Sequence, residues 1–255
     1  MAYQYEHNKR QRVAVPGQPQ VGPSDHEIEV RTSWAGLLDD AAPRVLPLEV
    51  DARDDEARRY CSDGALLRLD HLFTREEAER LIALSDSIGF GRTNYPKSYR
   101  GNLRLITVDA SLAEALWARL RPVVPPKLVD SDGEWEAVGL NECWRLAKYV
   151  PGDRFGAHCD TCFQRSAREV SMYTVNIYMN DVAPEHGGAT RFYHDRDQRK
   201  DAALGAPVLS VVPSAGLGVV FRQPPGACLL HDGEELRAGV KYLFRSDVMY
   251  RMVAK

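Results

Sequence analysis

The sequence predicts a mainly β protein in which a double-stranded β-helix (jelly roll) is supported by α-helices packed on its outside. After residue 135, short segments rich in β-branched and aromatic residues follow one another, separated by Gly, Pro, Asp and Asn. Seven or eight such strands within roughly 110 residues are typical of an antiparallel double sheet. The helical patterns lie before this region, where they can cover a sheet from outside.

Composition divides the chain into three parts. Residues 1–25 are polar and rich in Gln, Pro and Gly, which favours a flexible tail. Residues 26–140 are expected to form a support region, and residues 141–255 the jelly-roll catalytic core. We expect these last two parts to make one compact domain.

Two helices are predicted in the support region. Thr74 and Glu77 have the spacing of a capping box, and the apolar positions after them repeat with a helical period. This pattern predicts a helix over 75–88 that ends near Gly89. A second helix is predicted over 111–121, because leucines share one face there and prolines follow. Between the charged run at 51–59 and the first helix, ALLRLDHLF is typical of a strand.

Composition also argues against several classes of function. The net charge is −3 with Lys and Arg spread along the chain, which gives no electrostatic footprint for nucleic acid. No apolar run approaches the ~20 residues of a membrane helix, and MAYQYEHNKRQR lacks the apolar segment of a secretory signal. Five irregularly spaced cysteines argue against a disulfide scaffold, so a cytoplasmic location is expected. Nothing here indicates the oligomeric state.

His158 and Asp160 are two positions apart in a segment with strand character. Side chains at i and i+2 leave a strand on the same face, so this imidazole and carboxylate should point at one spot. His231 lies 71 positions beyond Asp160, at the end of the predicted strand ACLLHD. Two histidines and one carboxylate are the facial triad of non-haem iron(II) oxygenases. Chance H-x-D pairs are common, so the triad needs support from its context.

Lys241 supplies part of that context, because it lies 10 positions after His231 near the start of the next predicted strand. A lysine there can pair with the distal carboxylate of a 2-oxo acid whose other end chelates the metal. The alternative is a solvated strand lysine.

Residues 141–251 resemble the catalytic domain of the prolyl 4-hydroxylase-like 2-oxoglutarate/Fe(II) oxygenases. The matching pieces, in order, are GLNECWRLAKYVPGDRFGAHCD, YTVNIYMND, HGGATRFY and HDGEELRAGVKYLFRSDVMYR. The predicted helices and the YRGNLR between them resemble the N-terminal support of bacterial members. The resemblance implies that His158, Asp160 and His231 hold Fe(II) and that Lys241 anchors 2-oxoglutarate.

The resemblance also implies cosubstrate contacts from Tyr149, Tyr178 and Asn176, although both tyrosines also fit as packed strand aromatics. It implies O₂ as the second cosubstrate, with ascorbate as a stimulating reductant. The implied reaction is hydroxylation of an unactivated C–H bond in an amino acid, an amino-acid-derived small molecule or a peptidyl residue, with release of succinate and CO₂. Desaturation and ring formation use the same iron centre and remain open.

The segment 92–104 is the candidate substrate loop, because polar and aromatic residues concentrate there between the two helices. The candidate substrate contacts are Tyr99, Arg100, Asn102, Arg104 and Arg145. A solvated connector is the alternative for each loop residue. Arg191 and Arg245 are expected to form structural salt bridges.

Two departures from the family pattern bear on the substrate. The loop after H-x-D is TCFQ (161–164), where members often have a small or acidic residue. His186 precedes the Gly-Gly where an acidic residue is more usual. Both positions can change which substrate fits, so proline is not assigned.

Two alternatives belong to other classes of protein. A zinc-binding module could use Cys143, Cys159, Cys162 and His158, but Cys159 should face away from its neighbours in a strand, and no second motif completes a tetrahedral site. We therefore expect neither Cys159 nor Cys162 to be a metal ligand. The other alternative, a non-catalytic jelly-roll binding protein, fits less well with an intact triad and Lys241.

Overall fold

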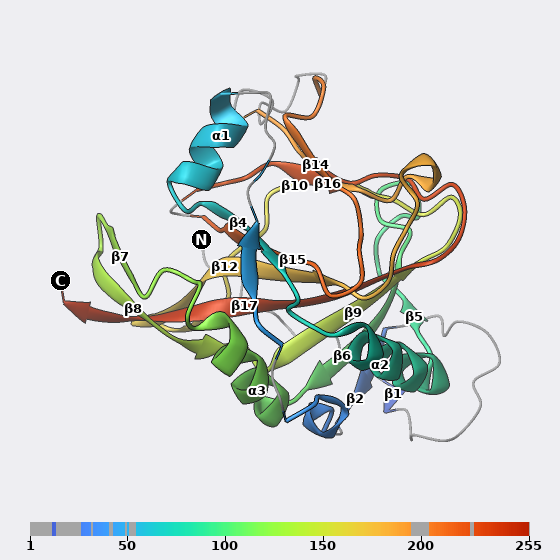
Figure 1. Ribbon diagram of the computed structural model, residues 1–255, viewed down its shortest axis with the longest axis horizontal. Helices are drawn as coiled ribbons and strands as arrows, with labels where there is room; N and C mark the ends of the chain where they lie inside the picture. Colours follow the sequence, from blue (N-terminus) through green and yellow to red (C-terminus); the bar gives the residue numbers. More distant parts are fainter. Residues whose placement is uncertain are drawn as a thin grey trace.

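The computed structural model describes residues 12–13, 27–31, 33–40, 43–48, 50, 55–194, 204–224 and 227–254. Strands dominate these residues and form two sheets, with helices α2 and α3 against the side of the larger sheet that faces away from the smaller one (Figure 1). The predicted mainly β class, with a jelly roll and helices outside it, is confirmed.

The larger sheet carries most of the chain. Its path runs through β1 (Arg12–Val13), β2 (Ile28–Val30), β6 (Leu103–Val108), β9 (Cys143–Tyr149), β17 (Lys241–Ala254), β12 (Glu169–Tyr178), β15 (Gly218–Arg222), β4 (Leu66–Asp70) and β3 (Leu46–Leu48). Four further strands pair off this path: β5 (Gly91–Arg92), β7 (Lys127–Asp130), β8 (Gly133–Leu140) and β11 (Gln164–Ser166). The strand predicted from ALLRLDHLF is β4.

The smaller sheet has the order β10 (Phe155–His158), β16 (His231–Gly233), β13 (Thr190–Phe192) and β14 (Leu209–Val211), and all its pairs are antiparallel. The strand predicted over ACLLHD differs from the structure, because pairing begins only at His231. Leu229 and Leu230 are both buried as consecutive residues, so this apolar run packs into the core and does not alternate along a ladder. His231 therefore begins a strand and does not end one.

Alternation along the central strands separates a core face from a site face. On β9 and β17, Trp144 and Phe244 stack with ring centroids 4.8 Å apart and belong to the core under the helices. A second apolar cluster, which includes Tyr178 and Phe192, lies between the two sheets. Because side chains alternate, the residues between these core positions face the smaller sheet.

The helices follow the predicted bounds closely. Helix α2 (Arg75–Ile88) begins after Thr74 with both halves of the capping box, and α3 (Ala110–Leu120) begins one residue earlier than predicted. Arg119 on α3 donates to both oxygens of Glu77 on α2, at 2.6 and 2.8 Å, and this buried pair ties the helices together.

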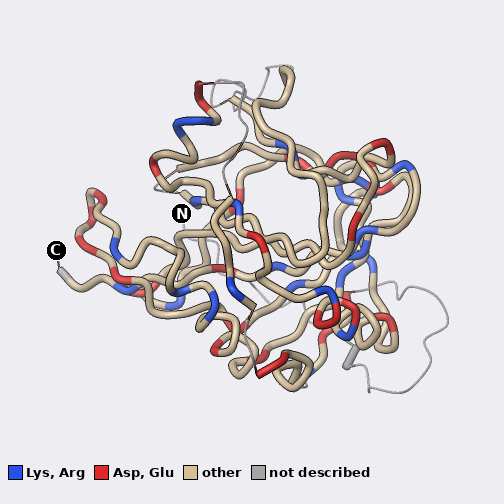
Figure 2. The backbone as a smooth tube through the Cα atoms, viewed as in Figure 1, with Lys and Arg blue, Asp and Glu red and all other residues tan. Residues whose placement is uncertain are grey.

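Three short helical elements were not predicted: η1 (Ala35–Leu37), α1 (Asp55–Ser62) and η2 (Pro184–His186). Of the predicted tail 1–25, only Arg12 and Val13 are described, and they pair with β2. The rest of the tail lies outside the described residues. None of the described helices is long and apolar enough to cross a membrane. Figure 2 shows Lys and Arg interspersed with Asp and Glu along the described backbone.

One disulfide corrects an expectation from the sequence. Cys159 and Cys228 are bonded, with their Cα atoms 5.5 Å apart, whereas the cysteine spacing argued against such links. The partners are 69 positions apart and meet only because β10 and the segment before β16 lie side by side. Such a pairing depends on tertiary structure and has no local signal.

Candidate functional site

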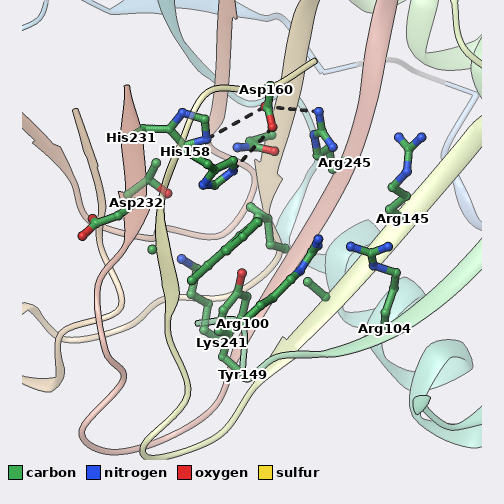
Figure 3. Close-up of a pocket in the computed structure, with 16 residues that line it drawn as sticks. Arg100, Arg104, Arg145, Tyr149, His158, Asp160, His231, Asp232, Lys241 and Arg245 are labelled. Carbon is green, nitrogen blue, oxygen red and sulfur yellow. Dashed lines mark ion pairs between the residues drawn. The ribbon is translucent and has the colours of Figure 1, made fainter. Parts of the chain in front are cut away.

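The three predicted metal ligands converge in front of the smaller sheet (Figure 3). His158 ends β10 and His231 begins β16, directly opposite each other in the antiparallel pair. Asp160 lies beyond the end of β10, so the prediction that it shares a strand with His158 was wrong in detail. Its carboxylate still approaches both rings, at 3.5 Å from His158 Nε2 and 3.9 Å from His231 Nε2. One ligand atom of each residue lies within 4.8 Å of the others.

Backbone carbonyls orient both imidazoles for metal binding. The Nδ1 of His158 lies 2.9 Å from Gly156 O, and the Nδ1 of His231 lies 2.9 Å from Leu229 O. Because a carbonyl only accepts, each Nδ1 carries a proton, which leaves Nε2 as the nitrogen of each ring that can bind a metal. Burial and the neighbouring His158 lower the pKa of His231 to about 4, so this ring is neutral at neutral pH.

Asp160 is held as a carboxylate. Burial by itself would raise its pKa, but Arg245 and the two histidines outweigh burial and hold the pKa well below its usual range. Thr174 Oγ1 donates to Oδ2 at 2.7 Å, and the Arg245 guanidinium lies 3.1 Å from the same oxygen. Two imidazoles and one carboxylate are the donor set that suits non-haem Fe(II), so these residues fit that metal.

A cavity of about 50 Å³ lies beside the triad, and a larger cavity of about 430 Å³ shares its wall. All three triad residues line the smaller cavity, whose far wall includes Lys241 and Tyr149. The larger cavity is lined by Tyr95, Tyr99 and residues 161–163, among others. The two cavities are therefore adjacent, with space for a small molecule beside the metal and for a larger molecule further out.

Lys241 is a buried cation, only 2% exposed, at the first position of β17. Its Nζ donates to Gly188 O at 2.6 Å and lies 5.0 Å from the ring centroid of Tyr149 and 5.5 Å from that of Tyr178. Burial lowers its pKa to about 8. No carboxylate of the described residues makes an ion pair with it, and a buried charge without such a partner is costly. An anionic ligand in the cavity would complete this site.

Tyr149, Tyr178 and Asn176 lie on the same wall as Lys241. Tyr149 is directly opposite Lys241 across β9 and β17 and lines the smaller cavity. The hydroxyl of Tyr178 donates to Thr190 Oγ1 at 2.7 Å, and the centroid of its ring lies 5.5 Å from the Nζ of Lys241. Asn176 also lines the cavity, and its buried Oδ1 has no hydrogen-bond partner among the residues that the structure describes.

The predicted substrate contacts divide into two groups. Arg100, Arg104 and Arg145 line both cavities, and Tyr99 lines the larger one. Asn102 is buried and lies outside both linings. Its Oδ1 accepts from Arg100 Nε at 3.1 Å, so Asn102 orients the Arg100 side chain without lining either cavity.

The two arginines predicted to form salt bridges both do so. Arg191 donates two hydrogen bonds to the carboxylate of Asp232, from Nε to Oδ1 at 2.9 Å and from Nη2 to Oδ2 at 2.5 Å. Arg245 pairs with Asp247 at 3.4 Å, and it also contacts Asp160, which sequence reasoning missed because the two are 85 positions apart.

Sequence reasoning also missed the aromatic packing behind the triad. The ring of Phe155 stacks on His158 at 3.9 Å between centroids, and the guanidinium carbon of Arg100 lies 4.2 Å from the centroid of the Phe155 ring. Phe221 and Phe192 pack near His231, at 4.9 and 5.6 Å between centroids. Strand propensity flagged these aromatics, but nothing in the sequence pointed them at the metal ligands.

A known family matches the part of the chain that contains this site. Residues 144–246 match the model of the 2OG-Fe(II) oxygenase superfamily, and this span contains all three triad residues and Lys241. This match places residues 144–246 among the 2OG-Fe(II) oxygenases. No curated protein matches its sequence.

Solved structures share the fold of this chain. A viral collagen prolyl hydroxylase from Paramecium bursaria Chlorella virus-1, solved as a 2-oxoglutarate complex, has a TM-score of 0.51 and 16% identity over 75% of this chain and 99% of that one. A prolyl hydroxylase from Trichoplax adhaerens, in complex with a hypoxia-inducible-factor peptide fragment, has a TM-score of 0.52 and 14% identity over 74% and 86%. A Pseudomonas putida prolyl-4-hydroxylase has 0.50 and 18% over 74% and 95%.

Proposed function

We propose that this dioxygenase couples oxidation of 2-oxoglutarate by O₂ to hydroxylation of an unactivated C–H bond, with release of succinate and CO₂. The substrate class is an amino acid, an amino-acid-derived small molecule or a peptidyl residue. The proposal rests on one observation. Three metal-ligand atoms lie within 4.8 Å of one another in a cavity that is also lined by a buried lysine, and this lysine has no carboxylate partner among the described residues.

In this proposal His158, Asp160 and His231 hold Fe(II), which when bound supplies the activation of O₂. The carbonyls of Gly156 and Leu229 fix the histidine tautomers. Thr174 and Arg245 hold the carboxylate of Asp160 in place and ionised. These contacts fix the ligand positions before the metal arrives, which is the protein's contribution to a metal site.

Lys241 binds the distal carboxylate of 2-oxoglutarate, while Tyr149 and Tyr178 flank the ammonium with their rings. Asn176 offers its unpaired amide oxygen to the same cavity. Burial of this wall keeps water away from the charge pair and strengthens it. One of the solved prolyl hydroxylases with this fold is a 2-oxoglutarate complex, which supports the assignment.

The larger cavity is the proposed substrate site. Tyr99, Arg100, Arg104 and Arg145 line it together with residues 161–163, where the sequence departs from the family pattern. A related fold binds a peptide, which keeps a peptidyl residue among the candidates. The different loop is the reason that proline is not singled out.

A screen of amino acids and peptides for substrate-stimulated turnover of 2-oxoglutarate tests the proposal. Mass spectrometry should find a product heavier by one oxygen, together with succinate, and ascorbate is expected to stimulate turnover. A control with His231→Ala should give neither product. Succinate that forms without dependence on iron, or a protein that binds 2-oxoglutarate but never consumes it, would refute the proposal.

A further inference from the structure

A short segment joins the metal site to the wall of the larger cavity. Residues 161–163 follow Asp160 directly, line that cavity and precede β11. Both ends of this stretch are held by side chains of β12. Thr174 Oγ1 donates to Asp160 Oδ2 at 2.7 Å, and Ser171 Oγ accepts from the backbone N–H of Phe163 at 2.7 Å. The metal-ligand carboxylate and the proposed substrate wall are therefore attached to one strand.

A β-bulge in β12 brings these two side chains to the same face of the sheet. In a regular strand, side chains three positions apart point to opposite faces. Ser171 and Tyr173, however, lie opposite neighbouring residues of β17, so β12 carries one extra residue between them. The extra residue shifts the alternation by one, and Ser171 and Thr174 then share the site face. Bulges are frequent beside active sites, where they re-aim a side chain in this way.

Gln223 bridges the two side chains. It follows β15 directly, is 1% exposed, and donates its backbone N–H to Met172 O at 2.9 Å, which sets it beside the bulge. Ser171 Oγ donates to Gln223 Oε1 at 2.7 Å, and Gln223 Nε2 donates to Thr174 Oγ1 at 2.8 Å. The same Nε2 also donates to Asp247 Oδ1 at 2.8 Å. The amide thus uses its oxygen and both of its N–H groups.

Each hydrogen bond in this chain has a determined direction. Asp247 forms an ion pair with Arg245, and a carboxylate only accepts, so it requires the amide nitrogen of Gln223 on its side. The amide oxygen then takes the single proton of the Ser171 hydroxyl, and Thr174 gives its own proton to the carboxylate at the metal site. These side chains are all buried, where an unmade hydrogen bond is costly, so the chain is expected to hold or break as a unit.

We propose that Gln223 is a positioning residue that couples metal binding to the order of the substrate wall at 161–163. The carboxylate of Asp160 becomes fixed when the triad holds a metal, and the chain of hydrogen bonds passes this constraint to Phe163. By reciprocity, a substrate that orders the same wall strengthens metal binding. The proposal rests on the proposed function for the words metal and substrate, but the coupling itself does not depend on turnover.

Cys162 reports the state of this wall, because it is a free thiol within 161–163 and lines the larger cavity. The full chain is alkylated with iodoacetamide, metal-free and with saturating Mn(II), and each thiol is followed by peptide mass spectrometry. Mn(II) favours oxygen ligands over thiolates, and its occupancy follows from the paramagnetic resonance signal of the free ion. It should slow the alkylation of Cys162 by about fivefold or more, the lower end of ordinary coupling between sites. Cys61 on α1 is the internal reference, whose rate should not change.

Two variants interrupt the chain at different points. Ser171→Ala removes the hydroxyl that joins the wall to the amide, and Gln223→Met removes the amide at nearly unchanged volume. In both variants the alkylation rate of Cys162 should be the same with and without Mn(II), at equal metal occupancy. Ser246→Ala is the matched control, because this fully buried serine donates to Asn141 O at 2.6 Å and takes no part in the chain. Protection by Mn(II) should persist in that control.

Protection of Cys162 that survives in Ser171→Ala or in a folded Gln223→Met protein would overturn the proposal, because the metal would then shield the thiol directly. The absence of protection in the wild type would also overturn it. If Gln223→Met fails to fold, Thr174→Val takes its place, since it breaks the chain on the other side of Gln223 and should lose protection, whereas Thr174→Ser should keep it. Protection without any substrate-stimulated turnover would end the proposed function and leave the coupling, and turnover without protection would do the reverse.

Discussion

Replacing Lys241 with alanine should weaken the binding of 2-oxoglutarate without removing the metal. The ammonium is 2% exposed and has no carboxylate partner among the described residues, so a bound distal carboxylate would meet it in a desolvated pocket. Truncating one partner of such a buried pair costs about 2–5 kcal/mol. At about 1.4 kcal/mol per tenfold, the dissociation constant should rise by roughly 30-fold to several thousand-fold. Lys241→Arg should recover part of the affinity, because the charge returns in a longer, planar form.

Lys148 provides the matched control. It lies on β9 one rung away, opposite Tyr242, on the other face of the sheet, where it pairs with Asp86 at 2.7 Å. As a partly exposed ion pair it should contribute at most about 1 kcal/mol to stability and nothing to cosubstrate binding. The assay is an anaerobic titration of 2-oxoglutarate into the Fe(II) protein, followed by the visible absorption of the chelate. An unchanged dissociation constant in Lys241→Ala, or an equal loss in Lys148→Ala, would refute the reasoning.

Three further predictions concern pH and stability. Because burial lowers the pKa of Lys241 to about 8, the affinity for 2-oxoglutarate should be full below pH 8 and fall as the pH rises above it, and Lys241→Arg should flatten this profile in calorimetric titrations. Arg119→Ala leaves the fully buried Glu77 carboxylate unpaired, so denaturant unfolding should show a loss of about 3–5 kcal/mol, whereas a loss below about 1 kcal/mol would mean that the pair is solvated. Replacing Cys159 and Cys228 with serine should lower the free energy of unfolding by about 2–4 kcal/mol under oxidising conditions, and an unchanged value would show that the bond does not constrain the folded protein.

Local patterns predicted the parts of the fold that local forces determine. The capping box at Thr74 and the helical period after it gave α2 its bounds, because both features act within one or two turns. The small sheet was harder, since its strands are only three or four residues long. Such short segments carry little periodicity, which is why the start of β16 at His231 was misplaced.

Contacts distant in sequence account for what was missed at the site. The triad was recognisable because its residue types and spacing point to one chemistry. The contact of Arg245 with Asp160, and the cross-strand pair of Arg145 and Arg245, depend on the register of β17. Register is set by the buried face of the whole sheet, so the sequence suggested each arginine alone but could not predict these contacts between them and with Asp160.

The most direct test of the central claim is an anaerobic titration of Fe(II) into the metal-free protein with saturating 2-oxoglutarate. The account predicts one equivalent of iron per chain and a chelate absorption band that saturates at that ratio. His158→Ala, Asp160→Ala and His231→Ala should each abolish the band while leaving the circular dichroism spectrum unchanged. A band of wild-type intensity and stoichiometry in His231→Ala would contradict the account, because the iron would then be held elsewhere.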